Sequence, residues 1–163
     1  MLRCSRRCID WSPGRLAREF KRRLGDPVPV RLGGTPYSAH LLTARVLEQI
    51  VRVVTGQQEG PPAATMVTHP ANWGPYKREL LEQAVRLADV TAGLCAEPYA
   101  AAVRYAAGQR VGVDEIVAVY DLGGGTFDAA VLRKTTGGFE LLGQSEGIEQ
   151  LGGVDFDEAI PGM

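Results

Sequence analysis

Three consecutive glycines between two strand-like segments are the feature that most constrains how this chain folds. Residues 116–120 are mostly β-branched or aromatic, and residues 127–132 include Phe127, Val131 and Leu132, so each segment is predicted to form a strand. A hairpin turn needs one or two residues of positive φ, so three glycines exceed that need. Glycine also lets a ligand approach the backbone, where successive N–H groups can converge on an anion. The stretch therefore indicates an anion-binding hairpin.

Polar side chains flank this turn. Asp121 and Asp128 bracket it, and Thr126 follows the glycines with a hydroxyl group. Carboxylates beside bound phosphates are suited to hold Mg²⁺ between them. The simpler alternative is a glycine-rich hairpin tip with two solvated aspartates, because glycine-rich turns are common.

The full string from Asp121 to Asp128 resembles the second phosphate loop of the actin-fold ATPases, and in this form the loop of the heat-shock-protein-70 (DnaK-type) chaperones. Four other segments resemble that family in the same order, over roughly residues 15–160: Phe20–Gly25, Val67–Trp73, Glu97–Ala102 and Leu151–Asp157. The resemblance implies an α/β, actin-like ATPase (ribonuclease H-like) fold, incomplete, with parts of both lobes. Residues 1–14 are expected to be an irregular basic N-terminus, and residues 15–163 a partial nucleotide-binding domain without the peptide-binding domain.

The resemblance also implies site residues for ATP or ADP and Mg²⁺. In the family, the residue matching Lys21 lies next to the γ-phosphate and the attacking water, and the residue matching Thr126 contacts the γ-phosphate. The residue matching Asp121 holds magnesium-bound water and helps to orient the attacking water, so the resemblance implies catalytic roles for Lys21, Asp121 and Thr126. Glu97 matches a residue that touches the water shell of the metal. The expected backbone contacts to the nucleotide come from Gly123, Gly124, Gly125, Gly152 and Gly153. On sequence alone, Lys21 reads as a surface lysine, and Glu97 as a carboxylate favoured at a helix N-terminus.

Two further residues match an allosteric relay of the family. Pro70 and Arg78 correspond to a proline and an arginine that pass the nucleotide state to the peptide-binding domain. On sequence alone, Pro70 ends a strand and Arg78 is a solvated helix residue.

Several features depart from the family pattern. An apolar residue of the family is replaced by His69, a threonine by Tyr99, and an acidic residue by Val154. Nothing in residues 1–20 resembles the first phosphate loop, and most of the adenosine site has no counterpart. Because phosphoryl transfer relies on positioned groups from both lobes, we expect very weak nucleotide affinity and negligible ATPase activity for this chain alone.

Composition narrows the remaining possibilities. The 163 residues suit one domain, and the formal net charge of −1 gives no argument for nucleic acid as a partner. No apolar run approaches the length of a membrane span, so no membrane partner is expected. Cys4, Cys8 and Cys95 lack the paired spacing of a zinc site. Reduced thiols and a cytoplasmic location are therefore expected.

Hydrophobic periodicity and turn residues predict alternating strands and helices. Thr35 and Pro36 are typical of a helix start. The predicted helices are 15–24, 36–54, 75–89, 97–108 and one opened by the glycine turn at 151–157; the predicted extended segments are 28–32, 64–68, 92–96, the two hairpin strands and 139–142.

The function implied by the resemblance is that of an ATP-dependent molecular chaperone. ATP hydrolysis with Mg²⁺ would be coupled, in the intact protein, to binding and release of unfolded polypeptides and to co-chaperones. One alternative is another actin-fold ATPase, such as a sugar kinase or filament-forming relative. Another is a non-enzymatic remnant or interaction module, which would not respond to magnesium-nucleotide.

Overall fold

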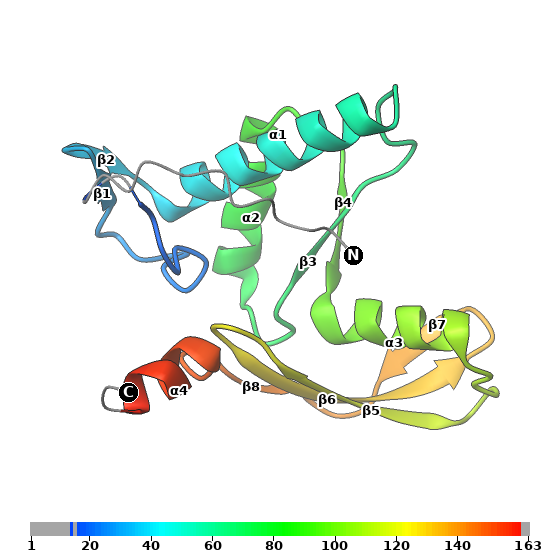
Figure 1. Ribbon diagram of the computed structural model, residues 1–163. Coiled ribbons are helices and arrows are strands. Elements are labelled where there is room, and N and C mark those ends of the chain that lie inside the picture. The colour runs from blue at the N-terminus through cyan, green and yellow to red at the C-terminus, as the bar shows by residue number, and fades with distance from the viewer. Residues whose placement is uncertain (1–13, 15, 161–163) are drawn as a thin grey trace.

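Two groups of elements make up the fold seen in the computed structural model, which describes residue 14 and residues 16–160 (Figure 1). Helices α1 (Ala39–Gln57) and α2 (Pro75–Leu87) pack against each other, whereas helix α3 (Glu97–Gly108) lies over a four-stranded sheet. This arrangement confirms the predicted α/β class. The cleft between the two groups is where the candidate site lies.

The segment before the first strand is not the helix that periodicity predicts for 15–24. The amides of Arg22, Arg23 and Leu24 bond to carbonyl groups three residues earlier, which is a series of turns. Glu19 has a φ of 53°, in the left-handed region that an α-helix excludes. The turns nevertheless bury Leu24, which is 2% exposed and joins the core of α1 and α2.

A short hairpin stands where the sequence predicts a helix start. Strands β1 (Val30–Leu32) and β2 (Thr35–Tyr37) pair antiparallel around Gly33 and Gly34, which both have positive φ, as a two-residue hairpin turn requires. Thr35 and Pro36 therefore lie in a strand, and the prediction that they open a helix is wrong. Helix α1 begins only at Ala39, because the Ser38 side chain accepts the hydrogen bond of the Leu41 amide.

The next elements form a parallel β-α-β unit. Strands β3 (Met66–His69) and β4 (Gly93–Ala96) pair in register, and α2 connects them. The predicted strand, helix and extended segment in this region are confirmed, with shifts of one or two residues at their ends. Its core consists of Leu24, Ala39, Trp73, Leu80 and Leu81, while Ala44, Ala84 and Ala88 let α1 and α2 approach closely.

The glycine hairpin belongs to the second group. Strands β5 (Ile116–Leu122) and β6 (Phe127–Thr135) pair antiparallel, and β6 also pairs with β7 (Gly138–Leu141) and β8 (Glu146–Ile148). Helix α3 packs Ala102 onto Ala130 and Leu132, so alanine permits a close helix–sheet contact. Helix α4 (Gly153–Ala159) follows at the loop end of the hairpin (Figure 1). The hairpin, β7, α3 and α4 were predicted; β8 was not.

The predicted irregular segment 1–14, with Cys4 and Cys8, lies outside the described residues except for Gly14. Cys95 on β4 is a free, half-buried thiol, and burial raises its pKa. Over residues 14 and 16–160, no helix combines the length and apolar character needed to cross a bilayer.

Candidate functional site

The glycine loop connects β5 to β6 through four residues, 123–126. The ladder ends with Leu122 opposite Phe127, and the Gly123 amide donates to the Thr126 carbonyl at 2.9 Å. None of the three glycines has φ in the left-handed region. The turn itself therefore does not require glycine for its handedness. A Cβ would be crowded only at Gly125, where Arg22 Nε would lie 3.0 Å away, while nothing lies within 4 Å of a Cβ at Gly124.

All three glycine carbonyls are bound from one side. The Gly153 amide donates to the Gly123 carbonyl and the Val154 amide to the Gly124 carbonyl, each at 3.0 Å. The Gly125 carbonyl accepts from Arg22 Nε at 2.7 Å. The start of α4 and Arg22 thus lie on the side of the loop to which its glycine carbonyls point, and this side is called the back of the loop.

This arrangement sets the direction of the loop amides. A trans peptide points its N–H opposite to its C=O, and no cis peptide occurs in the described chain. The amides of Gly124, Gly125 and Thr126 therefore point away from α4 and Arg22. None of these three amides donates a hydrogen bond to another residue in the part of the chain that the structure describes. Three adjacent unpaired amides on one side of a loop are the donor set that an anion needs.

Gly152 packs against the face of the Gly124–Gly125 peptide. A Cβ at position 152 would lie 2.5 Å from the Gly125 nitrogen and 2.6 Å from the Gly124 carbonyl carbon, so only glycine fits there. The sequence predicted that Gly152 and Gly153 belong to the nucleotide-binding residues. In the structure both lie at the back of the loop and outside the set of residues that line the cavity, and their contact with a nucleotide stays a prediction.

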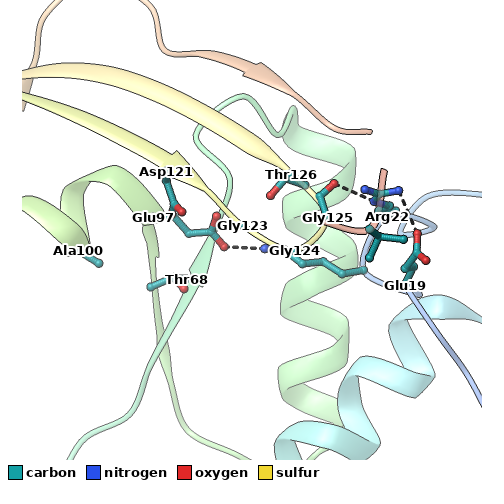
Figure 2. Close-up of a pocket in the computed structure, with 12 residues that line it drawn as sticks. Glu19, Arg22, Thr68, Glu97, Ala100, Asp121, Gly123, Gly124, Gly125 and Thr126 are labelled. Atoms are coloured by element: carbon teal, nitrogen blue, oxygen red, sulfur yellow. Dashed lines mark hydrogen bonds and ion pairs between the residues drawn. The ribbon is translucent and has the colours of Figure 1, made fainter. Parts of the chain in front are cut away.

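A cavity of about 530 Å³ opens beside the loop, between the two groups of elements (Figure 2). Its walls include every predicted residue for phosphate and metal contact apart from Gly152 and Gly153. The lining residues are Glu19, Lys21, Arg22, Thr68, Glu97, Ala100, Asp121, Gly123, Gly124, Gly125, Thr126 and Val154. The fold thus gathers residues as far apart in the sequence as Glu19 and Val154.

Lys21 and Glu97 form an ion pair at the cavity wall. Lys21 Nζ lies 2.8 Å from Glu97 Oε1, and the lysine side chain is about half exposed while the glutamate is 16% exposed. Lys21 comes from the turns before β1, and Glu97 is the first residue of α3, where the helix dipole favours a carboxylate. The pair places a cation and an anion on one wall, facing the loop region.

Two aspartates face each other across the hairpin next to the loop. Asp121 on β5 is directly opposite Asp128 on β6. Asp128 is 3% exposed, and its Oδ1 has no hydrogen-bond partner. Burial, and then the negative charge of Glu97, raise the pKa of Asp128. A buried carboxyl oxygen without a partner beside a second carboxylate suits a nearby cation.

The donor set fits Mg²⁺ held with phosphates better than a metal held by protein alone. No group of three or more acidic, histidine or cysteine ligands occurs within the described residues. Mg²⁺ is typically bound through one or two carboxylates, water and substrate phosphates. Asp121 and Glu97 line the same cavity as the glycine loop, so the two carboxylates and the three unpaired loop amides are present together.

Arg22 is a site residue that the sequence reasoning missed. Besides the Gly125 carbonyl, it contacts the Asp155 carboxylate with both terminal nitrogens and Glu19 with one. The hydrogen bond from Arg22 lowers the pKa of Asp155, and the same bond raises the pKa of Arg22. Its position directly after Lys21, in the segment that resembles the family, was the available signal. Thr68, Ala100 and Val154 also lie in segments that resemble the family, whereas Glu19 lies just before one.

The predicted relay residues lie away from the cavity. Pro70 is fully buried, and its carbonyl accepts from the Trp73 amide and lies 2.8 Å from His69 Nδ1. Arg78 lines a separate depression together with His69, Glu79 and Glu82. Pro70 therefore contacts His69, and Arg78, in the first turn of α2, lines the same depression as His69.

Comparison with known proteins identifies the class to which this fold and cavity belong. The family model described as Hsp70 protein matches residues 19–162. The chain belongs to the Hsp70 family, and the predicted actin-like ATPase fold is confirmed with that membership.

Curated relatives are chaperone protein HscA homologues from bacteria. The chain is 37% identical over 154 residues to that of Pseudomonas putida, covering 86% of this chain and 24% of the relative. It is 38% identical over 150 residues to that of Azotobacter vinelandii, covering 84% and 24%. It is 40% identical over 122 residues to that of Pseudomonas aeruginosa strain LESB58, covering 74% and 19%. The chain spans about a quarter of the length of the curated relatives it matches.

Proposed function

We propose that the chain contributes an ATP- and ADP-binding site to a molecular chaperone, and that residues 15–163 are part of its nucleotide-binding domain. The observation that carries this proposal is the loop 123–126, whose amides of Gly124, Gly125 and Thr126 are unpaired and face away from the groups that bind its carbonyls. These amides are suited to bind phosphate oxygens of a nucleotide.

Charged side chains then act on the phosphates. Lys21 is a compact cation that can neutralise charge developing on the γ-phosphate as the bond to the leaving oxygen breaks. The Thr126 hydroxyl donates to a phosphate oxygen. Asp121, and Glu97 through water, would hold Mg²⁺, which when bound neutralises phosphate charge. Asp121 also accepts a hydrogen bond from the attacking water and so orients it.

The proposal extends to coupling with other parts of the chaperone. HscA homologues carry the name chaperone, so the partners proposed are unfolded polypeptides and co-chaperones, in the cytoplasm. Pro70 and Arg78 are proposed as the relay. Their place beside His69, with Pro70 directly after β3 and Arg78 in the first turn of α2, supports this role.

The isolated 163-residue chain is proposed to bind nucleotide weakly and to hydrolyse ATP slowly. Among the residues that line the described cavity, one glycine loop offers amides for phosphate. Positioned groups supply most of the rate in phosphoryl transfer, so a site with one loop loses much of the acceleration.

Thermal unfolding with and without excess Mg-ADP and Mg-ATP tests the proposal. A ligand that binds only the folded state stabilises it by about 2.7 kcal/mol at a hundredfold excess over Kd. We expect an upward shift in Tm that requires magnesium and is abolished in Asp121→Asn and Lys21→Ala. Lys134→Ala, on β6 beside Phe139, is the matched control and should keep the shift. Absence of any shift at millimolar nucleotide would refute nucleotide binding by this chain.

A further inference from the structure

Arg22 makes contacts on three sides from a side chain that is only 13% exposed. Its Nε donates to the Gly125 carbonyl at 2.7 Å, and its two terminal nitrogens contact separate oxygens of Asp155. One of those nitrogens also contacts Glu19 at 2.9 Å. The residues joined lie 103 and 133 positions away in the sequence. A single planar group therefore connects the turns before β1, the glycine loop and helix α4.

The geometry depends on a guanidinium group rather than on charge alone. A planar guanidinium donates in fixed directions, and its two-point pairing with a carboxylate fixes the plane. Asp155, in turn, accepts from the Gly152 amide at 2.7 Å. The position of Arg22 Nε is thus set by α4, and this nitrogen determines where the Gly125 carbonyl points.

We propose that Arg22 is a positioning residue that fixes the orientation of the Gly125–Thr126 peptide and thereby holds the Thr126 amide in place to bind a phosphate of the nucleotide. This inference rests on the proposed function of the loop. The Gly123 and Gly124 carbonyls are held by amides of α4, but the third carbonyl has only this side chain as its partner in the described chain. Lys21 and Arg22 therefore have different roles: Lys21 pairs with Glu97 at the cavity wall, while Arg22 orients the loop.

The rival role is that of a simple cation near the anion, since Arg22 also lines the cavity. The two roles predict opposite results for Asp155→Asn. If Arg22 acts only by charge, removing the negative charge of Asp155 strengthens anion binding. If Arg22 acts by orientation, the same change weakens binding, because the two-point pairing is lost and the guanidinium is released.

The experiment measures Mg-ADP affinity of the 163-residue chain by titration calorimetry. Loss of a hydrogen bond from a charged donor corresponds to about a tenfold change, so we expect Arg22→Gln to weaken binding about tenfold. Arg22→Lys should not restore it, and Asp155→Asn should weaken it about threefold. Arg23→Gln and Asp157→Asn are matched controls in the same turn and the same helix; both should bind like the parent chain. Restored affinity in Arg22→Lys, or tighter binding in Asp155→Asn, overturns the proposal.

A second measurement separates this inference from the proposed function. In nucleotide-free protein, the backbone amide resonances of Gly125 and Thr126 should shift in Arg22→Lys, while those of the β6–β7 turn and the Tm stay unchanged. If the parent chain fails to bind Mg-ADP, the proposed function fails, and these resonances alone decide the inference: a shift supports it, and unchanged resonances overturn it. If Arg22→Gln does not fold, Arg22→Lys and Asp155→Asn provide the same decision.

Discussion

Lys77 on α2 donates to both carboxylate oxygens of Glu149, at 2.6 and 2.7 Å. Glu149 directly follows β8 and precedes the turn into α4, so the pair joins the α1–α2 group to the sheet that carries the glycine loop. The ammonium group also lies 5.9 Å from the centroid of the Trp73 ring. This contact ties the base of α2, where Pro70 and Arg78 lie, to the segment behind the loop.

Breaking this ion pair should destabilise the fold modestly. The side chains are 26% and 42% exposed, so we expect Lys77→Gln to lower the free energy of unfolding by about 0.5–1 kcal/mol at low salt. The loss should shrink at 1 M salt, because screening weakens the pair in the parent chain. Urea unfolding of the two single variants and of Lys77→Gln/Glu149→Gln gives the coupling energy. Coupling indistinguishable from zero at low salt would contradict a stabilising pair.

Gly152→Ala should disturb the loop from behind. The added Cβ would overlap the Gly124–Gly125 peptide at 2.5–2.7 Å, and overpacking of this kind costs about 1–3 kcal/mol. We expect a lower denaturation midpoint together with loss of any nucleotide-induced Tm shift. Gly137→Ala is the matched control, because no atom lies within 4 Å of its Cβ position. A Gly152→Ala variant as stable as the control would contradict this prediction, because it would show that α4 moves away from the loop without loss of stability.

The buried Asp128 should make stability fall as the pH rises. Its pKa in the folded protein is raised above the ordinary 3.8, chiefly by burial, so the folded state holds the proton more tightly than the unfolded chain. The protonated carboxyl makes its full contribution to the free energy of unfolding below about pH 3.8, and this contribution is lost as the pH rises through the folded pKa. The Asp128→Asn variant has no carboxyl group to deprotonate and so does not lose this stabilisation. The Tm of the variant minus the Tm of the parent chain should therefore increase as the pH rises from about 3.8 through the folded pKa of Asp128. Parallel Tm curves from pH 3 to 7 would exclude a raised pKa.

Ser38→Ala should destabilise the start of α1. The Ser38 side chain accepts from the Leu41 amide at 3.3 Å, and removing such a cap costs about 1 kcal/mol. Thr136→Ala, in the exposed β6–β7 turn, is the control and should change the free energy of unfolding little. Equal stability of the two variants in urea would show that the α1 cap contributes nothing.

Some local structure was predictable because the signals lie within a few residues. Pro75 at the first position of α2 and the alanine-rich run after Glu97 give helices with nearly the predicted bounds. The β5–β6 hairpin follows from apolar residues on both sides of three glycines. The errors occurred where local signals were ambiguous: Pro36 suits an edge strand as well as a helix start.

The sequence by itself determined the hairpin, the resemblance of its glycine loop to a family motif, and the Hsp70 family, because these depend on residue types at short, fixed spacing. The tertiary structure alone decided that Gly152 and Gly153 lie behind the loop, that Arg22 joins Gly125 to Asp155, and that β8 adds to the sheet. The physical reason is that these contacts join residues distant in sequence. Such contacts depend on the three-dimensional packing of whole elements, and hydrophobic periodicity shows which face of an element is buried but not which distant residues it meets.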